Sequence, residues 1–140
     1  MSARTGKQYV EGLRDDRVVW LGNQKVDVAT HPAFAGSVAG MAGYFDWQNQ
    51  HADECLVPDP QTGKPMSASL IVPRNADDLR RRRIAFERFA HYSEGMLGRT
   101  PDYVNVTLAG FIARSDIFGS SGDTTFAERL GRFYREVVDK

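Results

Sequence analysis

The chain has 140 residues, a length that allows one domain with a single core. Its composition, with 41% hydrophobic and 26% charged residues, is that of a globular protein. Lysine plus arginine equals aspartate plus glutamate at 18 each, and this zero net charge argues against nucleic-acid binding, which needs an excess of positive charge.

The cysteine content and the hydropathy pattern narrow the class of protein further. The single cysteine, Cys55, cannot form an internal disulfide or a multi-cysteine metal site, and it fits a reducing compartment. The first twenty residues show no signal peptide, and no stretch approaches the roughly 20 apolar residues of a membrane span. We therefore expect a cytoplasmic protein that binds neither membrane nor nucleic acid.

The first third of the chain is predicted to form two helices with a β-hairpin between them. Apolar spacing and β-branched runs predict a helix over 5–13, strands over 17–21 and 25–28, and a helix over 33–49. Gly22 and Asn23 supply the turn of the hairpin. Thr30 is the predicted cap of the longer helix, because its hydroxyl group precedes Pro32 in the first turn.

The middle of the chain is predicted to hold a loop, a strand and a long helix. Residues 56–65 (LVPDPQTGKP) contain three prolines and a glycine and are expected to be a loop, with a strand over 67–72. Asn75 can cap a helix that runs to about Glu94. The core-facing side chains of this helix are expected to be Leu79, Phe86, Phe89 and Ala90.

Four consecutive arginines, 80–83, lie within this long helix. Asp77 and Asp78 each precede an arginine by four positions, the favourable orientation for ion pairs on a helix surface. We interpret the run as a solvated helix face. A phosphate-binding or partner-docking patch is the alternative, and the balanced net charge does not support it.

Two further helices are predicted in the last third of the chain. Thr100 and Pro101 suit the cap and first position of a helix over 101–112, and Thr125 begins a capping-box pattern for a helix over 125–138. The apolar stripes are expected at Val104, Leu108, Phe111 and Ile112, and at Phe126, Leu130, Phe133, Tyr134 and Val137. The predicted fold class is therefore mainly α with a few short β-strands.

The segment GRTPDY, residues 98–103, is the best candidate for chemistry. Arg99 lies just outside a predicted helix N-terminus and Tyr103 lies in its first turn, so a guanidinium group, unpaired backbone amides and a phenolic hydroxyl group could converge. Such a place suits an oxygen atom that carries negative charge. The alternative is that Arg99 only braces the start of the helix.

Other residue types give weaker signals. None of the three histidines, His31, His51 and His91, pairs with another at helical spacing, so a metal site is not expected. Cys55 has no CxxC partner and is expected to be a small apolar side chain rather than a nucleophile. No GxGxxG, Walker or GxSxG pattern is present.

Four segments in chain order carry a resemblance to a known family: RTGKQYVEGL at 4–13, DVATHPAF at 27–34, RNADDLR at 74–80 and MLGRTPDYVNV at 96–106. Together they resemble the oxygenase component of the 4-hydroxyphenylacetate 3-monooxygenase (4-hydroxyphenylacetate 3-hydroxylase) family. The likeness covers nearly the whole chain at similar spacing. It is therefore more specific than any one of the motifs.

The resemblance implies a fold and an activity. Residues 1–140 would form the helical N-terminal domain of an acyl-CoA dehydrogenase-like flavin monooxygenase, with the central β-domain and the C-terminal helical bundle outside this chain. The implied reaction is ortho-hydroxylation of a phenol, such as 4-hydroxyphenylacetate, with reduced FAD and O2. A separate flavin reductase supplies the reduced FAD in this family, and the oxygenases are typically homotetramers.

The resemblance also implies site residues. Arg99 and Tyr103 would contact the phenolic oxygen of the substrate, and Thr100, Pro101 and Asp102 would form the connecting wall of the pocket. The family's active-site histidine and most FAD contacts would lie beyond Lys140. We therefore expect an incomplete site and an inactive isolated chain. A fragment, an engineered domain and a truncated reading frame all stay open, as does the identity of the phenol.

Two alternatives remain at this stage. The 4-hydroxybutyryl-CoA dehydratases share this domain, but their iron–sulfur cluster needs cysteine ligands before the motif, and residues 91–98 contain none. The other alternative is a non-catalytic helical module that serves protein assembly. Binding of flavin and phenol to the purified chain would distinguish this module from the hydroxylase.

Overall fold

The structure, a computed structural model, describes residues 3–96, 102–118 and 125–139. The helices are α1 (Gly6–Glu11), η1 (Pro32–Phe34), α2 (Ala35–Gln50), α3 (Ala52–Cys55), η2 (Ala68–Leu70), α4 (Ala76–Ser93), α5 (Asp102–Ala113), η3 (Ser115–Phe118) and α6 (Thr125–Asp139), where η marks a 3₁₀-helix. The strands are β1 (Val19–Leu21), β2 (Gln24–Val26), β3 (Leu56–Pro58) and β4 (Pro65–Ser67). The predicted mainly α class is confirmed.

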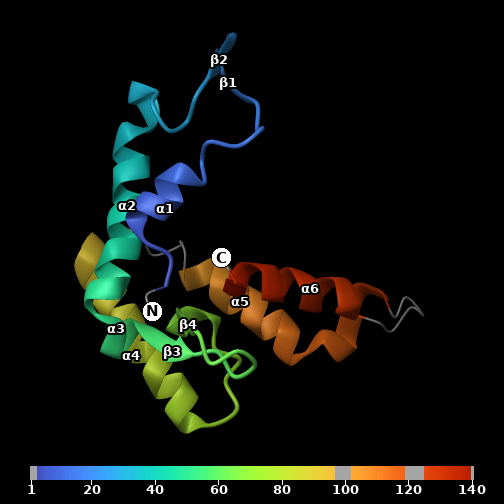
Figure 1. Cartoon of the computed structure of the whole chain (residues 1–140). Helices are drawn as coiled ribbons and strands as arrows, with labels where there is room; N and C mark the ends of the chain where they lie inside the picture. Colours follow the sequence, from blue (N-terminus) through green and yellow to red (C-terminus); the bar gives the residue numbers. More distant parts are fainter. Residues whose placement is uncertain (1–2, 97–101, 119–124, 140) are drawn as a thin grey trace.

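The molecule has two main parts and a projecting hairpin (Figure 1). We call α2, α3, α4, η2 and the β3–β4 hairpin the body, and α5, η3 and α6 the helical pair. In the pair, α5 and α6 lie side by side and run in opposite directions. The β1–β2 hairpin extends away from the body, beyond α1. Among the described residues, no helix is both long enough and apolar enough to cross a membrane.

The core of the body lies where α2 and α4 meet the β3–β4 hairpin. The Tyr44 ring from α2 packs on the Phe89 ring from α4, with 4.6 Å between the ring centroids. Both side chains are almost completely buried. The other buried members of this cluster are Cys55, Val57, Met66, Ala68, Leu70, Ile71 and Ala85. Burial of these apolar side chains is the main source of stability in the body.

Helix α1 is held against α2 by its first residue. Thr5 caps α1 in a capping box with Gln8, and the Gly6 amide donates a 2.8 Å hydrogen bond to the Asp46 carboxylate. A Cβ atom on Gly6 would lie 2.4 Å from the backbone oxygen of Ala42. Only glycine therefore permits this close approach of the two helices.

The predicted first hairpin is confirmed, with slightly shorter strands. Val19 pairs with Val26 and Leu21 pairs with Gln24 in an antiparallel register. Gly22 has a φ of 60°, the left-handed conformation that such a tight turn needs. The side chains of Val18, Trp20 and Leu21 are exposed.

The predicted hydroxyl cap was wrong, because the side-chain cap belongs to η1, which leads into α2, and α2 itself has none. The cap is His31, whose Nδ1 atom accepts a 3.2 Å hydrogen bond from the Ala33 amide at the start of η1. The Thr30 hydroxyl group instead donates to the Asp27 carboxylate at 3.1 Å. Pro32 occupies the first helical position, so the capping residue is the one immediately before it.

The predictions for 56–65 and 67–72 were also wrong. The ends of the expected loop pair as β3 and β4, with Pro58 opposite Pro65 at the end of the ladder, where the missing amide groups cost little. The expected strand over 67–72 ends at Ser67, and η2 follows. The Ser67 hydroxyl group accepts from the Ser69 amide at 3.4 Å and so caps this 3₁₀ turn. The short helix α3 was not predicted.

Helix α4 begins as predicted but buries a different face. Asn75 accepts a 2.9 Å hydrogen bond from the Asp78 amide and caps the helix. Phe89 is buried and Phe86 partly buried, whereas Leu79 and Ala90, both expected to face the core, are exposed. The difference arises because α2 and α3 cover the side of α4 that carries Ala85 and Phe89.

The arginine run in α4 is solvated only in part. Asp77 pairs with Arg80, three positions away, instead of with an arginine four positions away. The Asp78 carboxylate accepts a 2.8 Å hydrogen bond from the Arg74 backbone amide, so this carboxylate stays at the N-terminus of α4. Arg82 is half-buried, with its guanidinium group 5.8 Å from the centre of the Phe86 ring, and burial lowers the pKa of Arg82. The i, i+4 ion pairs predicted for the run are therefore wrong.

The helical pair contains little buried apolar surface. In α5 only Leu108 and Ala109 are buried, and Val104 and Phe111 of the predicted stripe are exposed. In α6, Tyr134 packs with Val137 and Val138 on the core cluster, whereas Phe126 and Phe133 are exposed. Phe118 of η3 bridges the two helices, with ring centroids 5.2 Å from Phe111 and 5.4 Å from Phe126.

Polar contacts connect α6 to the body. The Arg135 guanidinium group donates to both carboxylate oxygens of Asp59, at 3.0 and 3.1 Å. The Tyr134 hydroxyl group donates to the Leu70 carbonyl at 2.7 Å. Asp59 is buried and also accepts from the backbone and hydroxyl group of Thr62. Arg135 holds the pKa of Asp59 at about 2, so the pair is ionised at neutral pH.

Candidate functional site

Two of the residues predicted to bind substrate, Asp102 and Tyr103, lie at the N-terminus of α5. Asp102 is the first residue of α5 and Tyr103 is the second, with 63% of its surface exposed. Arg99, Thr100 and Pro101 lie outside the described residues. The convergence of Arg99 and Tyr103 on one oxygen atom therefore stays a prediction.

Helix α4 ends just before this segment in a defined way. Glu94 and Gly95 both have positive φ, 50° and 80°, and the Gly95 amide donates to the Ala90 carbonyl at 2.9 Å. This arrangement closes the helix and turns the chain away from its axis. It confirms the predicted break near Gly95.

The last turn of α4 is fixed on α2 through Tyr92. The Tyr92 hydroxyl group donates to the Gly40 carbonyl at 2.9 Å. A Cβ atom on Gly43 would lie 2.2 Å from the Tyr92 hydroxyl oxygen, so the absence of a side chain at Gly43 makes room for this contact. Nearby, the Trp47 indole donates to the Arg88 carbonyl at 3.3 Å. The last turn of α4, which precedes the candidate segment in the sequence, is thus held against α2.

The first turn of α5 is connected to the body by Asn105. Its side-chain amide donates to the Ser69 hydroxyl oxygen at 2.8 Å, and the hydroxyl oxygens of Ser69 and Ser67 are also 2.8 Å apart. Ser69 is completely buried. Leu108 and Ala109, one turn after Asn105, complete the buried face of α5.

Sequence reasoning missed Asn105, although a signal was present. Asn105 lies three and four positions before Leu108 and Ala109, so it belongs to the same helix face as the buried residues. An amide on a buried helix face needs a hydrogen-bond partner. That spacing could have predicted a polar contact between α5 and the body.

The structure also shows where the cysteine and two of the histidines lie. Cys55 is completely buried, and burial raises the pKa of its thiol to about 11, which confirms it as a packing side chain. The centroids of the His51 and Trp47 rings are 4.3 Å apart, and His91 is exposed on α4. Among the residues that the structure describes, no group of three His, Cys, Asp or Glu side chains could hold a metal ion.

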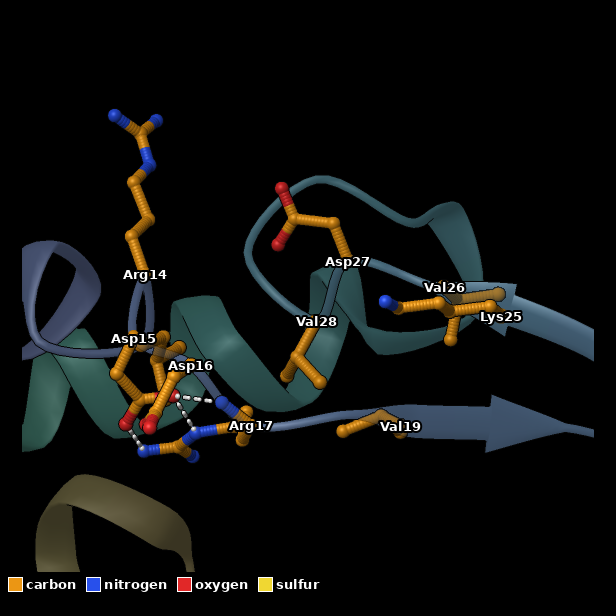
Figure 2. A pocket seen from close by; sticks show the side chains of 10 residues that line it. Arg14, Asp15, Asp16, Arg17, Val19, Lys25, Val26, Asp27 and Val28 are labelled. Atoms are coloured by element: carbon orange, nitrogen blue, oxygen red, sulfur yellow. Dashed lines mark hydrogen bonds and ion pairs between the residues drawn. The ribbon is translucent and has the colours of Figure 1, made fainter.

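An open hollow of about 680 Å³ lies beside the β1–β2 hairpin (Figure 2). It is lined by residues 13–17, Val19 and 25–28, which carry charges of both signs. The Asp15 carboxylate binds the Arg17 side chain at 2.6 Å, and these hydrogen bonds lower the pKa of Asp15 to about 2. Asp15 and Arg17 therefore pair with each other, and the hollow includes none of the predicted site residues.

A second open hollow, of about 380 Å³, runs along α4 and is lined by Leu79, Arg82, Arg83, Phe86, Glu87 and Ala90. It too lies apart from Tyr103 and Asn105. The described ranges contain no glycine-rich phosphate loop of the kind that holds dinucleotides.

Residues 5–140 match the family described as 4-hydroxyphenylacetate 3-hydroxylase N terminal. The chain belongs to this family. The matched range includes the GRTPDY segment and Asn105, so the first turn of α5 lies within the part that the hydroxylase family shares.

Relatives of the chain are oxygenase components. The 4-hydroxyphenylacetate 3-monooxygenase oxygenase component of Geobacillus sp. (strain PA-9) is 38% identical over 136 residues, which cover 96% of this chain and 27% of that protein. The corresponding component of Thermus thermophilus is 35% identical over 140 residues, with coverage of 99% and 28%. A 4-nitrophenol 2-monooxygenase oxygenase component from Rhodococcus sp is 32% identical, with coverage of 97% and 26%. The chain thus spans about a quarter of their length.

Solved structures agree with this assignment. The oxygenase component of 4-hydroxyphenylacetate 3-monooxygenase complexed with FAD and 4-hydroxyphenylacetate superposes with a TM-score of 0.86 at 35% identity, covering 98% of this chain and 28% of that one. An archaeal 4-hydroxybutyryl-CoA dehydratase from N. maritimus has a TM-score of 0.73 at 20% identity, covering 97% of this chain and 27% of that one. The second likeness shows a shared fold alone.

Proposed function

We propose that this chain is the N-terminal, helical domain of a two-component FAD-dependent aromatic hydroxylase and forms the wall that holds the phenolic oxygen of the substrate. The observation that carries the proposal is the family match over 5–140, which includes the GRTPDY segment. In the structure the last two residues of the segment, Asp102 and Tyr103, begin α5, and Tyr103 is exposed on the first turn of that helix. Related oxygenases are named for phenolic substrates.

The proposed wall would act through electrostatics. Ortho-hydroxylation requires an electron-rich ring, and a phenolate ring is richer than a phenol ring. A free phenol has a pKa of about 10, and a nearby cation or helix N-terminus lowers that pKa by favouring the charged form. Arg99 and the first amides of α5 would supply these two influences. Tyr103 would donate a hydrogen bond to the same oxygen, and Thr100, Pro101 and Asp102 would shape the wall.

The remaining parts of the reaction would come from outside the described residues. FAD, supplied in reduced form by a separate flavin reductase, would provide the oxidising chemistry with O2 when bound. The active-site histidine is expected shortly beyond Lys140, and most flavin contacts are expected later still, in a central β-domain and a C-terminal helical bundle. We also propose a homotetramer and, because the only cysteine is a free buried thiol, a cytoplasmic location. The purified 140-residue chain should be colourless and should not hydroxylate phenols.

A chimeric oxygenase tests the proposal. This chain replaces the matching segment of the Thermus thermophilus oxygenase component, and turnover of 4-hydroxyphenylacetate is measured with reduced FAD. Arg99→Ala should lower kcat/KM by about ten- to a hundredfold, since a charged hydrogen bond contributes roughly 1.5–3 kcal/mol. Arg99→Lys should restore only part of the activity, because a point charge does not reproduce the planar guanidinium group. Tyr103→Phe removes a neutral hydrogen bond and should have a smaller effect.

The opposing outcome is equally specific. If Arg99 only braces the start of α5, Arg99→Ala should lower the Tm of the chimera and leave its kinetics normal at a permissive temperature. Normal turnover by the folded Arg99→Ala protein would contradict the substrate-binding assignment.

A second function, a helical module for protein assembly, is favoured by one observation. The helical pair exposes large apolar side chains at Tyr103, Val104, Phe111, Ile117, Phe126 and Phe133. A soluble monomer seldom exposes so many on adjoining helices, so further protein should cover them. A chimera that assembles and binds neither phenol nor flavin would favour this second function.

A further inference from the structure

We propose that Asn105 is a positioning residue that sets the direction of Tyr103 through the buried hydroxyl group of Ser69. The inference rests on the proposed function, because it concerns how the phenol-binding wall is held in place. Two consecutive hydrogen bonds run from α5 into the body: Asn105 to Ser69 at 2.8 Å, and Ser69 to Ser67 at 2.8 Å.

The geometry of a helix makes Asn105 suitable for this role. Residues two positions apart in an α-helix lie about 200° apart around its axis. Asn105 therefore faces the body when Tyr103 faces away from it, in agreement with a partly buried Asn105 and an exposed Tyr103. Attachment of Asn105 to the body fixes the rotation of the first turn of α5. That rotation determines where the Tyr103 side chain points.

The anchor for this contact is buried and hydrogen-bonded. Ser69 is completely buried, and its neighbours Ala68 and Leu70 are 0% and 4% exposed. The Leu70 carbonyl also accepts the 2.7 Å hydrogen bond from Tyr134 of α6. The short helix η2 thus holds both members of the helical pair, α5 at Ser69 and α6 at Leu70.

This pair of contacts provides a matched control. Asn105→Ala and Tyr134→Phe each remove one side-chain hydrogen bond between η2 and the helical pair. A purely structural role would make the two changes equivalent, since a neutral hydrogen bond of either kind contributes a similar amount to stability. Positioning of Tyr103 requires that only the Asn105 change alters the first turn of α5 and the chemistry at the phenol.

Hydrogen exchange on the 140-residue chain tests the structural part without any activity. Amide protection at 105–109 should fall about tenfold in Asn105→Ala and in Ser69→Ala, the loss expected from one hydrogen bond. The same amides should keep wild-type protection in Tyr134→Phe. Asn105→Asp should also keep it, because the new carboxylate can accept the Ser69 hydroxyl group. Unchanged protection in Asn105→Ala would overturn the proposal.

Kinetics of the chimeric oxygenase test the functional part. Asn105→Ala and Ser69→Ala should each lower kcat/KM for 4-hydroxyphenylacetate about tenfold, because misplaced contacts reduce productive alignment. The acid limb of the pH profile should move to higher pH in both, since the site ionises the phenol less well. The double variant should lose no more than either single variant. Tyr134→Phe should keep the wild-type profile.

Three outcomes separate the possible failures. A loss of turnover in Asn105→Ala with normal turnover in Ser69→Ala would overturn the route through Ser69 and make Asn105 a direct contact. Equal kinetics and equal pH profiles for Asn105→Ala and Tyr134→Phe would overturn positioning. An inactive wild-type chimera would contradict the proposed function, and hydrogen exchange would still decide whether Asn105 sets the first turn of α5.

Discussion

The body and the helical pair are held together by different interactions. In the body, Tyr44, Phe89 and Ala85 are at most 4% exposed and pack with the apolar residues of β3, β4 and η2. In the pair, Leu108 and Ala109 are buried, while the aromatic rings of Phe111, Phe126 and Phe133 remain 38–56% exposed. Tyr134, Val137 and Val138 of α6 pack on the core cluster of the body. Specific polar contacts add to this attachment: Asn105 to Ser69, Tyr134 to Leu70 and Arg135 to Asp59.

This difference matters for function because the candidate site lies on the part held by polar contacts. Apolar packing tolerates small shifts, whereas a hydrogen bond fixes both distance and direction. The body therefore supplies stability, and the polar contacts supply the placement of α5. Substitutions in the two parts should have effects of different size and kind.

The largest effect is expected in the core of the body. Phe89→Ala should lower the free energy of unfolding by about 3–5 kcal/mol, because it removes a buried ring and leaves a cavity between α2 and α4. The control is Phe133→Ala in α6, where the ring is 56% exposed and a change within about 0.5 kcal/mol is expected. Urea unfolding of both variants measures the difference, and equal losses would remove the distinction between the two parts.

The buried ion pair should give the next largest effect. Asp59→Asn removes the buried carboxylate that binds Arg135 and leaves Arg135 only the 3.8 Å ion pair with the exposed Asp139, so it should cost roughly 3 kcal/mol at neutral pH. Asp77→Asn is the control, because its ion pair with Arg80 is exposed and should contribute less than about 1 kcal/mol. Thermal unfolding of the two variants provides the comparison, and a negligible loss in Asp59→Asn would mean that Arg135 does not hold α6.

The ion pair between Asp59 and Arg135 should also make the stability of the fold depend on pH. The folded-state pKa of Asp59 is about 2, below the ordinary value of 3.8, so its stabilisation is present above pH 3.8 and is lost as the pH falls toward 2. The difference in Tm between the wild type and Asp59→Asn should therefore narrow over that window. A difference that stays constant between pH 5 and pH 2 would contradict the lowered pKa.

A smaller effect is expected where α1 meets α2. Gly6→Ala places a methyl group 2.4 Å from the Ala42 carbonyl oxygen and should destabilise the chain by about 1–3 kcal/mol. At Gly40, in the same helix as Ala42, a Cβ atom meets nothing within 4 Å. Gly40→Ala should therefore stabilise the chain by up to about 1 kcal/mol through helix propensity. Unfolding midpoints that move in the same direction for both variants would show that close packing does not limit position 6.

The smallest effect is expected for a neutral contact of the helical pair. Tyr134→Phe removes the hydrogen bond to the Leu70 carbonyl and should cost about 1 kcal/mol. The ring itself would keep its contacts with the core cluster. A loss as large as that of Phe89→Ala would place Tyr134 among the core residues and weaken the comparison.

Local sequence signals predicted much of the fold. The capping residue Asn75 and the Gly22 turn act through near neighbours, and their elements were placed within a few residues. Errors arose where distant contacts decide the outcome. Leu79 was assigned to the core because its spacing fits, but α2 and α3 cover another side of α4. The strands β3 and β4 were missed because their pairing joins residues on either side of a proline-rich loop.

The candidate site likewise combines a residue that the sequence could place with a contact that it could not. Tyr103 could be placed at the start of α5 from the helix-start pattern and the family resemblance. Asn105 could not be connected with Ser69, because 36 residues separate the two side chains in the sequence. Sequence patterns thus pointed to the candidate segment, and the folded structure was needed to find the contact between Asn105 and Ser69 beside it.

The ionisation of a bound phenol tests the central claim most directly. 4-Nitrophenol changes its absorbance when it loses its proton, so a titration of the chimeric oxygenase measures the pKa of the bound phenol. Arg99 and the first turn of α5 should lower that pKa below its value in water, and Arg99→Ala should bring it back toward that value. A bound phenol that ionises as it does in water, or identically in the wild type and in Arg99→Ala, would contradict the proposed role of this segment.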